Sequence, residues 1–454
     1  MTRELDIYSG LATANSTNTA RMTHGNVHAH PHYKPIVQEL VHLIHQNKWV
    51  DEFKLAVGTA IETDIEALEG IRSLDDYLHH INNFLTWLPE ENESGKRVYD
   101  EICLFYFILD QISVIRYQNA VVPSSIDLTV LSHWIVKYAN ALGDFYTTPE
   151  SISPETVATF YASPKYKMKD YVVPHGGWKN FNEFFCRHIK SGLREPEAPG
   201  YNTVVVSPAD SVFDGQWPVD NSNNVFFVKG LPWNISELLK GSKYADHFKG
   251  GTFMHAFLNT TDYHRQHAPV SGIVREAEII RGAAYLEVVV DPPSESTGST
   301  GSGSQSKPKK ARLVMRRGLR RHGHKHAKSS GSANHAKELD APDHPGYQFI
   351  QSRGLVVIET EDIGWVAVLP IGMAQVSSVK LSHKVTEAAK AGGKINKGDE
   401  ISHFEFGGSD IVMVFGGTTH VEFVTPIGQH NNTGTMIAKA NLKSKHVKEK
   451  ISNH

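Results

Sequence analysis

The spacing of hydrophobic positions changes near residue 163 of this 454-residue chain. Between residues 35 and 163 the apolar positions recur every three or four residues, which is the period of one face of an α-helix. From Val204 onward, apolar and polar residues alternate over short runs that end at turn residues, a pattern typical of half-buried strands. The pattern predicts an α+β chain, with an all-α N-terminal domain at 35–163 and a β-rich core, sandwiched or closed into a barrel, within 164–454.

Four helices are expected in the N-terminal domain. One follows Pro35, after which apolar residues recur on one helix face. Another begins at Ser73, which heads a capping box and precedes apolar residues at helical spacing. The remaining two cover residues 99–115 and 128–142. No pattern of residues in this domain indicates chemistry.

Two segments of the chain lack the composition needed to bury a core. Residues 1–34 are polar and are expected to be disordered. Residues 292–337 begin with a Ser/Gly-rich stretch, and ten Lys and Arg residues follow between 307 and 328 without an acid, so a flexible surface insertion is expected. Such a basic run is able to contact nucleic acid or an anionic membrane, but a solvated loop is the favoured interpretation. The alternating histidines within it are likewise interpreted as solvated rather than metal-binding: His322, His324 and His326.

Composition places the chain among soluble globular proteins, with 40% hydrophobic and 21% charged residues. A net charge of −3 argues against a nucleic-acid partner for the chain as a whole. Two cysteines, Cys103 and Cys186, are too few for a disulfide framework. The N-terminus lacks the apolar run of a secretory signal, and the most apolar stretch, 102–112, is too short to span a bilayer. A cytoplasmic location is therefore expected.

The stretch FEFGGSDIVMVFGG, residues 404–417, interrupts a β pattern with two adjacent glycines. A glycine pair within a strand marks a bulge, a tight bend or a place where backbone atoms are closely approached. Ser409 follows the pair directly. Glycine stands only on its N-terminal side, so the G-x-S-x-G elbow of hydrolases is absent. The exposed carbonyl beside the Ser409 hydroxyl is that of Gly408.

Two further segments supply groups that would activate this hydroxyl. Asp210 ends the motif SPAD after a β run, and His264 and His267 lie three residues apart in DYHRQH. Singly, each is more often a structural residue, but together with Ser409 they provide an acid, a base and a nucleophile in the order Asp, His, Ser. We expect the hydroxyl to attack the Gly408 carbonyl, and β-elimination from the resulting ester to break the chain and leave a pyruvoyl group at residue 409. The glycines permit the strained backbone that this attack requires.

The same segments, in the same order, are those of the phosphatidylserine decarboxylases, pyruvoyl enzymes that mature by this kind of self-cleavage. The chain resembles that family from FNEFFCRHIKSGLREP at 181–196, through SPAD and DYHRQHAPVSG, to INKGDEISHFEFGGS at 395–409 and on to near Val424. The resemblance implies that residues 164–454 form a pyruvoyl-dependent decarboxylase domain.

Residue by residue, the resemblance assigns the self-cleavage triad to Asp210, His267 and Ser409, and a role in decarboxylation to His264. The Gly-Ser pair at the cleavage site is the one that the family carries. The threonine or serine that usually follows it is replaced here by Asp410, which alters the hydrogen bonding next to the cleavage site.

The resemblance also implies the cofactor and the reaction. A pyruvoyl group formed from Ser409 would condense with a substrate α-amine to a Schiff base and accept the electron pair released as CO₂ leaves. His264 is expected to reprotonate the carbanion, and no metal is required. The helical domain looks like that of soluble fungal relatives that include L-tryptophan decarboxylases, which implies a free aromatic amino acid such as L-tryptophan as substrate. Phosphatidylserine, converted to phosphatidylethanolamine, is the alternative substrate, and a homodimer is the expected assembly.

A carrier module is the alternative from another class of protein. The segments APVSGIV and AGGKINKGDEISHFEFG resemble the paired hairpins of lipoyl and biotinyl domains. Those domains carry a modifiable lysine at the turn between the hairpins, in a Met-Lys-Met or Asp-Lys-Ala context, and this chain has neither. The enzyme is therefore the favoured interpretation.

Overall fold

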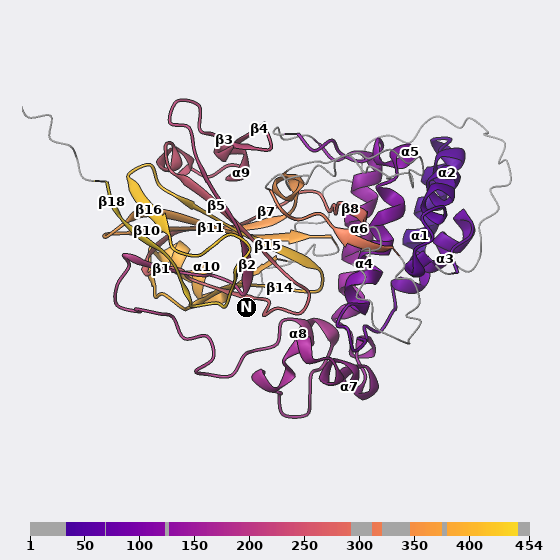
Figure 1. Cartoon of the computed structure of the whole chain (residues 1–454), viewed down its shortest axis with the longest axis horizontal. Helices are drawn as coiled ribbons and strands as arrows, with labels where there is room; N and C mark the ends of the chain where they lie inside the picture. Colours follow the sequence, from indigo (N-terminus) through magenta and orange to yellow (C-terminus); the bar gives the residue numbers. More distant parts are fainter. Residues whose placement is uncertain are drawn as a thin grey trace, which may run out of the picture.

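The computed structural model describes residues 33–68, 70–122, 127–291, 311–319, 346–374 and 379–443. Helices from the first part of the chain gather on one side of the molecule and strands on the other (Figure 1). This arrangement confirms the expected α+β class. Residues 1–34 were expected to be disordered, and all of them except Tyr33 and Lys34 lie outside the described part of the chain. The histidines at 322, 324 and 326 also lie outside it.

The helical side agrees with the apolar spacing in outline. Ser73 caps its helix as expected, because its hydroxyl accepts a hydrogen bond of 3.1 Å from the Asp76 amide. The helix expected at 99–115 is broken, since Gln111 adopts an extended backbone. The sequence analysis did not predict the helices at Val50–Ile61 and Pro154–Ala162. Their apolar faces are short or include alanines, so the helical spacing of apolar residues is weak there. The helices are α1 Pro35–Gln46, α2 Val50–Ile61, α3 Leu74–Phe84, α4 Arg97–Leu109, α5 Ile112–Ile115, α6 Val130–Tyr146 and α7 Pro154–Ala162.

Aromatic side chains join the helices to the strands. The connector after α7 contains the short helix α8, Phe181–Phe185, which Asn180 caps. Phe181 lies 5.5 Å, ring centroid to ring centroid, from Phe406, and Tyr146 of α6 lies 4.8 Å from the same ring. The glycine-serine segment therefore begins against this buried aromatic cluster.

The main sheet has eight antiparallel strands in the order β13-β7-β10-β11-β15-β5-β2-β17. The two central strands, β11 and β15, are long apolar runs because both faces of the sheet are covered there. Among the described residues no sheet closes on itself, so the barrel form of the expected core is wrong. The strands are β2 Ser211–Pro218, β5 Thr252–Leu258, β7 Gly272–Ile280, β10 Arg353–Thr360, β11 Gly364–Met373, β13 Lys394–Ile395, β15 Gly408–Phe415 and β17 His430–Asn431.

Smaller sheets flank the main one. Two of them have three strands, in the orders β1-β18-β16 and β12-β14-β6, and two are two-stranded ribbons, β3-β4 and β8-β9. Helix α10, His383–Ala391, packs on β7. The strands are β1 Val204–Val206, β3 Val225–Val228, β4 Leu231–Asn234, β6 Arg265–His267, β8 Val288–Asp291, β9 Arg312–Met315, β12 Val379–Leu381, β14 Glu400–Phe404, β16 Thr419–Phe423 and β18 Met436–Leu442.

The ribbon β8-β9 corrects one expectation. Residues 292–337 were expected to be a flexible insertion throughout, but 311–319 are ordered, and Leu313, Met315 and Leu319 are buried. The apolar residues of this short stretch alternate along a strand, and the many basic residues around it hide that alternation in the composition. The rest of 292–337 lies outside the described residues.

The ribbon packs against helix α4, so helices and strands share one hydrophobic core. The Met315 amide donates a hydrogen bond of 2.6 Å to the Tyr99 hydroxyl, and the Val288 amide donates one of 2.9 Å to the Asp110 carboxyl. Burial raises the pKa of Asp110 well above its ordinary value. Asp110 therefore satisfies a strand amide in the core, which explains a polar residue in the most apolar stretch of the sequence.

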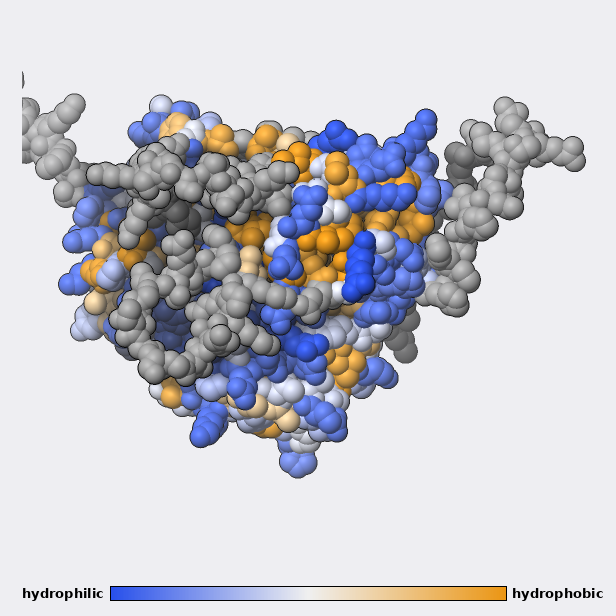
Figure 2. All heavy atoms as spheres, turned by 45° about the vertical axis from the view of Figure 1, so that its right-hand side comes forward, coloured by the Kyte–Doolittle hydropathy of each residue, from blue (hydrophilic) through white to orange (hydrophobic). Residues whose placement is uncertain are grey.

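Figure 2, in which the helical side comes forward, shows hydrophobic side chains gathered in one area among hydrophilic ones. Exposed large apolar residues of the helical part include Leu55, Ile112 and Val130. Within the described ranges, every helix is too short or too polar to cross a membrane.

We predict that Leu313→Ala and Met315→Ala each lower the free energy of unfolding by about 2–4 kcal/mol, because each removes a buried side chain from the contact between ribbon and helices. Thermal or chemical denaturation monitored by circular dichroism measures the loss. The matched control is Arg312→Ala on the same strand, whose exposed ion pair with Asp291 is worth at most about 1 kcal/mol. Equal stability of all three variants would contradict the packing described here.

Candidate active site

Ser409 lies at the start of β15, between β5 and β11. It pairs with Leu258 on one side and Gly372 on the other, and it is fully buried. The preceding Gly407 has φ +145°, a conformation that side-chain-bearing residues rarely adopt. The glycine pair is thus a bend between β14 and β15. Within the described part of the chain, the Ser409 hydroxyl has no hydrogen-bond partner.

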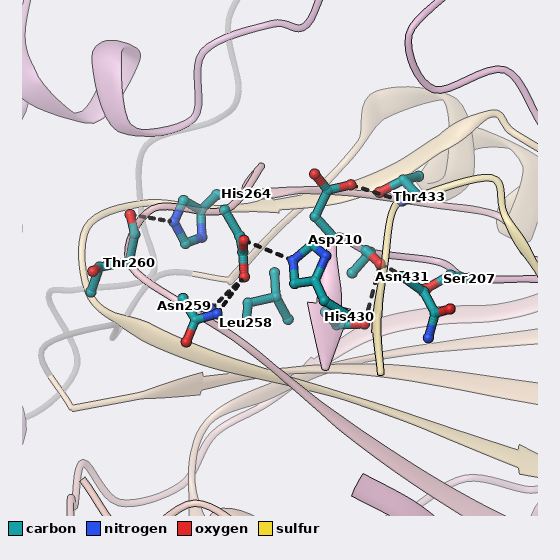
Figure 3. Close-up of polar contacts among 12 residues, drawn as sticks. Ser207, Asp210, Leu258, Asn259, Thr260, His264, His430, Asn431 and Thr433 are labelled. Atoms are coloured by element: carbon teal, nitrogen blue, oxygen red, sulfur yellow. Dashed lines mark hydrogen bonds and ion pairs between the residues drawn. The ribbon is translucent and has the colours of Figure 1, made fainter. Parts of the chain in front are cut away.

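Asp210 lies in the turn between β1 and β2 and is buried. Arg194 binds its carboxylate with two hydrogen bonds, of 2.8 Å from Nε and 2.7 Å from Nη2. The Thr433 amide donates a third, of 2.7 Å, to Oδ1 (Figure 3). A guanidinium and a main-chain amide thus satisfy both oxygens of the Asp210 carboxyl group. Among the described residues, these hydrogen bonds to Asp210 do not include one from a histidine.

His267 ends β6, and its main-chain amide donates to the Pro208 carbonyl of the SPAD motif, at 2.8 Å. Its Nδ1 lies 2.7 Å from the Gly398 carbonyl oxygen and its Nε2 lies 3.0 Å from the Tyr263 hydroxyl. Because a carbonyl only accepts, Nδ1 carries the proton and Nε2 is the acceptor. Burial lowers the pKa of His267, which favours this neutral form.

His264 is more deeply buried and stacks on the Phe185 ring at 4.0 Å between centroids. Its Nε2 lies 3.3 Å from the Thr260 carbonyl oxygen (Figure 3). Nε2 is therefore the protonated nitrogen, and Nδ1, which has no partner among the described residues, presents a lone pair. Burial lowers the pKa of His264 to about 3, so this imidazole is a neutral base rather than a charged acid in the uncleaved chain.

The loop that carries His264, between β5 and β6, is held by Asp262. Its carboxylate accepts a hydrogen bond of 2.7 Å from the main-chain amide of Asn259. The other carboxylate oxygen lies 2.9 Å from Nε2 of His430 (Figure 3). The hydrogen bond to Asp262 raises the pKa of His430. The ion pair joins the loop to β17, so His264 has a fixed position.

The two predicted histidines contact β14 at different points. The main-chain amide of Phe404, shortly before the cleavage site, donates a hydrogen bond of 2.9 Å to the His264 carbonyl. His267 pairs across the strands with Glu400, which lies farther from the cleavage site. His264 therefore contacts β14 at a point nearer to the Gly-Ser segment than His267 does, and the main chain of His267 contacts the SPAD motif that carries Asp210. In the described part of the uncleaved chain, no hydrogen bond joins Asp210 to His267 or His267 to Ser409.

A second buried group next to Ser409 was missed by sequence reasoning. His255 lies between two carboxylates, with Nε2 2.9 Å from Asp410 and Nδ1 3.0 Å from Asp214. Burial by itself lowers the pKa of His255, but the charge of Asp410 and the hydrogen bonds to both carboxylates outweigh it and raise the pKa to about 9. His255 is therefore an imidazolium that donates from both nitrogens. Successive side chains of a strand point to opposite faces, so this group and the Ser409 hydroxyl lie on opposite faces of β15.

Polar residues inside apolar strands were the available signal for this group. His255 interrupts the run TFMHAFL and Asp214 interrupts SVFDGQW. A lone buried histidine is usually structural, and only the pairing of β2 with β5 and of β5 with β15 reveals the partners.

Comparison with known proteins is consistent with this site. Residues 181–439 match the phosphatidylserine decarboxylase family, a range that contains Asp210, His264, His267 and Ser409. The decarboxylase iboD of Amanita muscaria is 26% identical over 298 residues, which cover 63% of this chain and 75% of that protein. The phosphatidylserine decarboxylase proenzyme of Fusobacterium nucleatum is 27% identical over 288 residues, 62% of this chain and 75% of its own. Phosphatidylserine decarboxylase proenzyme 3 of Schizosaccharomyces pombe is 26% identical over 270 residues, 60% of this chain and 22% of its own.

We predict that replacing His255 removes a pH dependence from stability. The folded-state pKa of about 9 lies above the ordinary value of 6.5, so the stabilisation is complete below pH 6.5 and is lost as the pH rises through 9. The wild-type melting temperature should therefore fall more steeply between pH 6.5 and 9.5 than that of His255→Gln, with a difference in free energy on the order of 3 kcal/mol.

The control for this comparison is His383→Gln, at an exposed position of α10. Its melting curve should follow the wild type across the whole pH range. Parallel curves for wild type and His255→Gln would show that His255 is not charged between its carboxylates.

Proposed function

Because this chain belongs to the phosphatidylserine decarboxylase family, whose members are decarboxylases, we propose that it is a pyruvoyl-dependent enzyme that cleaves itself between Gly408 and Ser409. The observation that carries the proposal is the buried, unpartnered Ser409 hydroxyl directly after the bend at Gly407. A hydroxyl that only packed there would be expected to satisfy its hydrogen bonds.

Maturation uses the chain's own atoms. The Ser409 oxygen attacks the Gly408 carbonyl carbon, and the Ser409 nitrogen takes up a proton as the peptide bond becomes an ester. Elimination then releases Gly408 as a carboxylate and leaves a dehydroalanine, which water converts to pyruvoyl and ammonia. His267 is the proposed base because the family resemblance assigns it to the self-cleavage triad; its Nε2 is unprotonated and accepts from the Tyr263 hydroxyl in the uncleaved chain. The Gly398 carbonyl orients this imidazole in the uncleaved chain, and Asp210 contributes a negative charge nearby.

A pyruvoyl group at residue 409 supplies a conjugated carbonyl that accepts the electron pair released when CO₂ leaves. Its precursor is buried at the end of a central strand, where the surrounding core excludes water. The lone pair at Nδ1 of His264 takes a proton from the substrate α-ammonium. The same nitrogen then returns that proton to the α-carbon after decarboxylation. A nearby substrate carboxylate would raise the pKa of His264 from its low resting value and so assist the first transfer.

The substrate is proposed to be a free α-amino acid, and the resemblance to fungal enzymes supports an aromatic one such as L-tryptophan. Phosphatidylserine is the second candidate. Two of the relatives carry the name phosphatidylserine decarboxylase, which supports it, whereas the Amanita relative is named only as a decarboxylase. Release of CO₂ from L-tryptophan, from other amino acids and from phosphatidylserine vesicles distinguishes these substrates.

We predict that the purified wild type consists of two chains, residues 1–408 and 409–454, and that Ser409→Ala is uncut and inactive. Without the hydroxyl there is neither a nucleophile nor a pyruvoyl precursor. Intact mass spectrometry measures the cleavage, and Ser222→Ala, at an exposed loop position, is the control that should cleave normally. An active wild type that consists of one uncut chain would exclude the proposal.

We further predict that His264→Ala still cleaves but loses decarboxylation by roughly 10²–10⁴-fold, which is the usual contribution of a positioned acid or base. His267→Ala should remain largely uncut. Gel analysis and CO₂ release on the same preparations separate maturation from turnover. If His264→Ala stays uncut and His267→Ala is cleaved, the two roles must be exchanged.

A further inference from the structure

Arg317 is a buried cation that the mechanism above does not use. Its residue is 7% exposed, and it follows β9 in the part of the chain that composition had indicated to be a flexible loop. The guanidinium donates from Nη1 to the Leu258 carbonyl. Its Nε and Nη2 have no hydrogen-bond partner within the described ranges of the chain.

Strand register places this guanidinium beside the cleavage site. Leu258 pairs with Ser409 and Phe257 pairs with Asp410. The Arg317 guanidinium carbon lies 5.8 Å from the centre of the Phe257 ring. The Leu258 carbonyl therefore places the guanidinium at the end of β5, beside the main chain of the cleavage site, while the Phe257 ring lies on the Asp410 face of the sheet.

Among other arginines in the described part of the chain, Arg194 and Arg353 have partners for their guanidinium groups, whereas the buried Arg187 is only partly satisfied. Arg194 binds Asp210 with two hydrogen bonds. Arg353 donates to four main-chain carbonyls. Nε and Nη2 of Arg187 also lack a hydrogen-bond partner in the described structure, but its guanidinium lies 4.0 Å from the ring centre of Tyr171 and near two more aromatic rings. Arg317 has one carbonyl and one ring, which leaves two charged donors unsatisfied beside the site.

Unpaired polar atoms of other residues surround this end of the strand. Buried atoms without a hydrogen-bond partner in the described structure include Oδ1 of Asp410, the Tyr347 hydroxyl and Oε1 of Gln348. The side-chain amide of Gln348 donates a hydrogen bond of 2.8 Å to the main-chain carbonyl of Arg317. The charge of Asp410 raises the pKa of the Tyr347 hydroxyl, and the charge of Arg317 lowers it. A buried charge with unmade hydrogen bonds is costly unless a ligand supplies the partner.

We propose that Arg317 binds an anionic group of the substrate, one that remains in the amine product. This inference rests on the proposed decarboxylase function. An ion pair with the departing carboxylate would be strongest before the reaction and would vanish as neutral CO₂ forms, so it would raise the barrier. A charge that persists through the reaction avoids that penalty.

Two sources offer such a charge. One is the phosphodiester of phosphatidylserine, and the other is the acidic side chain of a free amino acid. L-Tryptophan has neither, so this inference sets the substrate apart from the aromatic expectation. The planar guanidinium, with adjacent Nε and Nη2 donors, suits both carboxylate and phosphate.

The experiment compares wild type with Arg317→Gln on four substrates: L-glutamate, its neutral isostere L-glutamine, L-tryptophan, and phosphatidylserine in vesicles with phosphatidylcholine. We expect wild type to prefer an anionic substrate. We expect Arg317→Gln to lower kcat/KM for that substrate by about 10–100-fold, the value of a hydrogen bond to a charged group, and to leave kcat/KM for the neutral substrates unchanged.

Arg316→Gln is the matched control, because Arg316 is next in sequence and pairs with Glu287. Activity confined to vesicles assigns the charge to the lipid headgroup, and activity on L-glutamate assigns it to a free acid.

Binding supplies a second measurement that does not depend on turnover. Calorimetric titration with L-glutamate and O-phospho-L-serine, and vesicle flotation, should show binding to wild type that Arg317→Gln weakens. The absence of binding to every anionic probe would overturn the inference, and so would equal loss of activity on charged and neutral substrates. Failure of Arg317→Gln to cleave itself would also overturn it, since Arg317 would then be a counter-charge for Asp410. Uncut wild type without CO₂ release would instead refute the proposed function.

Discussion

The pairing of β15 with β5 and β11 is the constraint on which the site depends. It fixes Ser409 opposite Leu258 and Gly372 in the middle of the largest sheet, where the hydroxyl is buried and unpartnered. The loop that leaves the end of β5 carries His264, and the Leu258 carbonyl at that end binds Arg317. Three groups from distant parts of the sequence therefore converge because two strands have one register.

The alternation of side chains along β15 separates two kinds of chemistry. Ser409 lies on one face, and Asp410, with its partners His255 and Asp214, lies on the other. If the peptide bond before Ser409 breaks, residue 409 becomes a chain end held only by the strand ladder and its neighbours. The ion pair of Asp410 with His255 then anchors the second residue of that new chain, which gives a physical reason for an aspartate where relatives are expected to carry a hydroxyl residue.

The apolar spacing was sufficient for the helices at Pro35 and Ser73 and for the change to strands after residue 203, because those signals are local. It failed at 311–319, where a short strand is surrounded by basic residues whose composition dominates any average. The candidate residues Asp210, His264, His267 and Ser409 were accessible from motifs, and the family match covers all four positions. The partners of those residues were not accessible: Arg194 for Asp210, Gly398 for His267 and Thr260 for His264.

The sequence by itself determined the candidate reactive residues: a serine after two glycines, two histidines three apart and an aspartate after a strand. Identity and local spacing carry that information, because they depend on neighbours along the chain. Only the tertiary structure decided the protonation of those groups, since burial and contacts across strands set which imidazole nitrogen carries the proton and whether His255 is charged. It also decided that a cation from an unremarkable basic run lies buried beside Ser409, because strand register, which composition does not encode, brings β5, β15 and the end of β9 together.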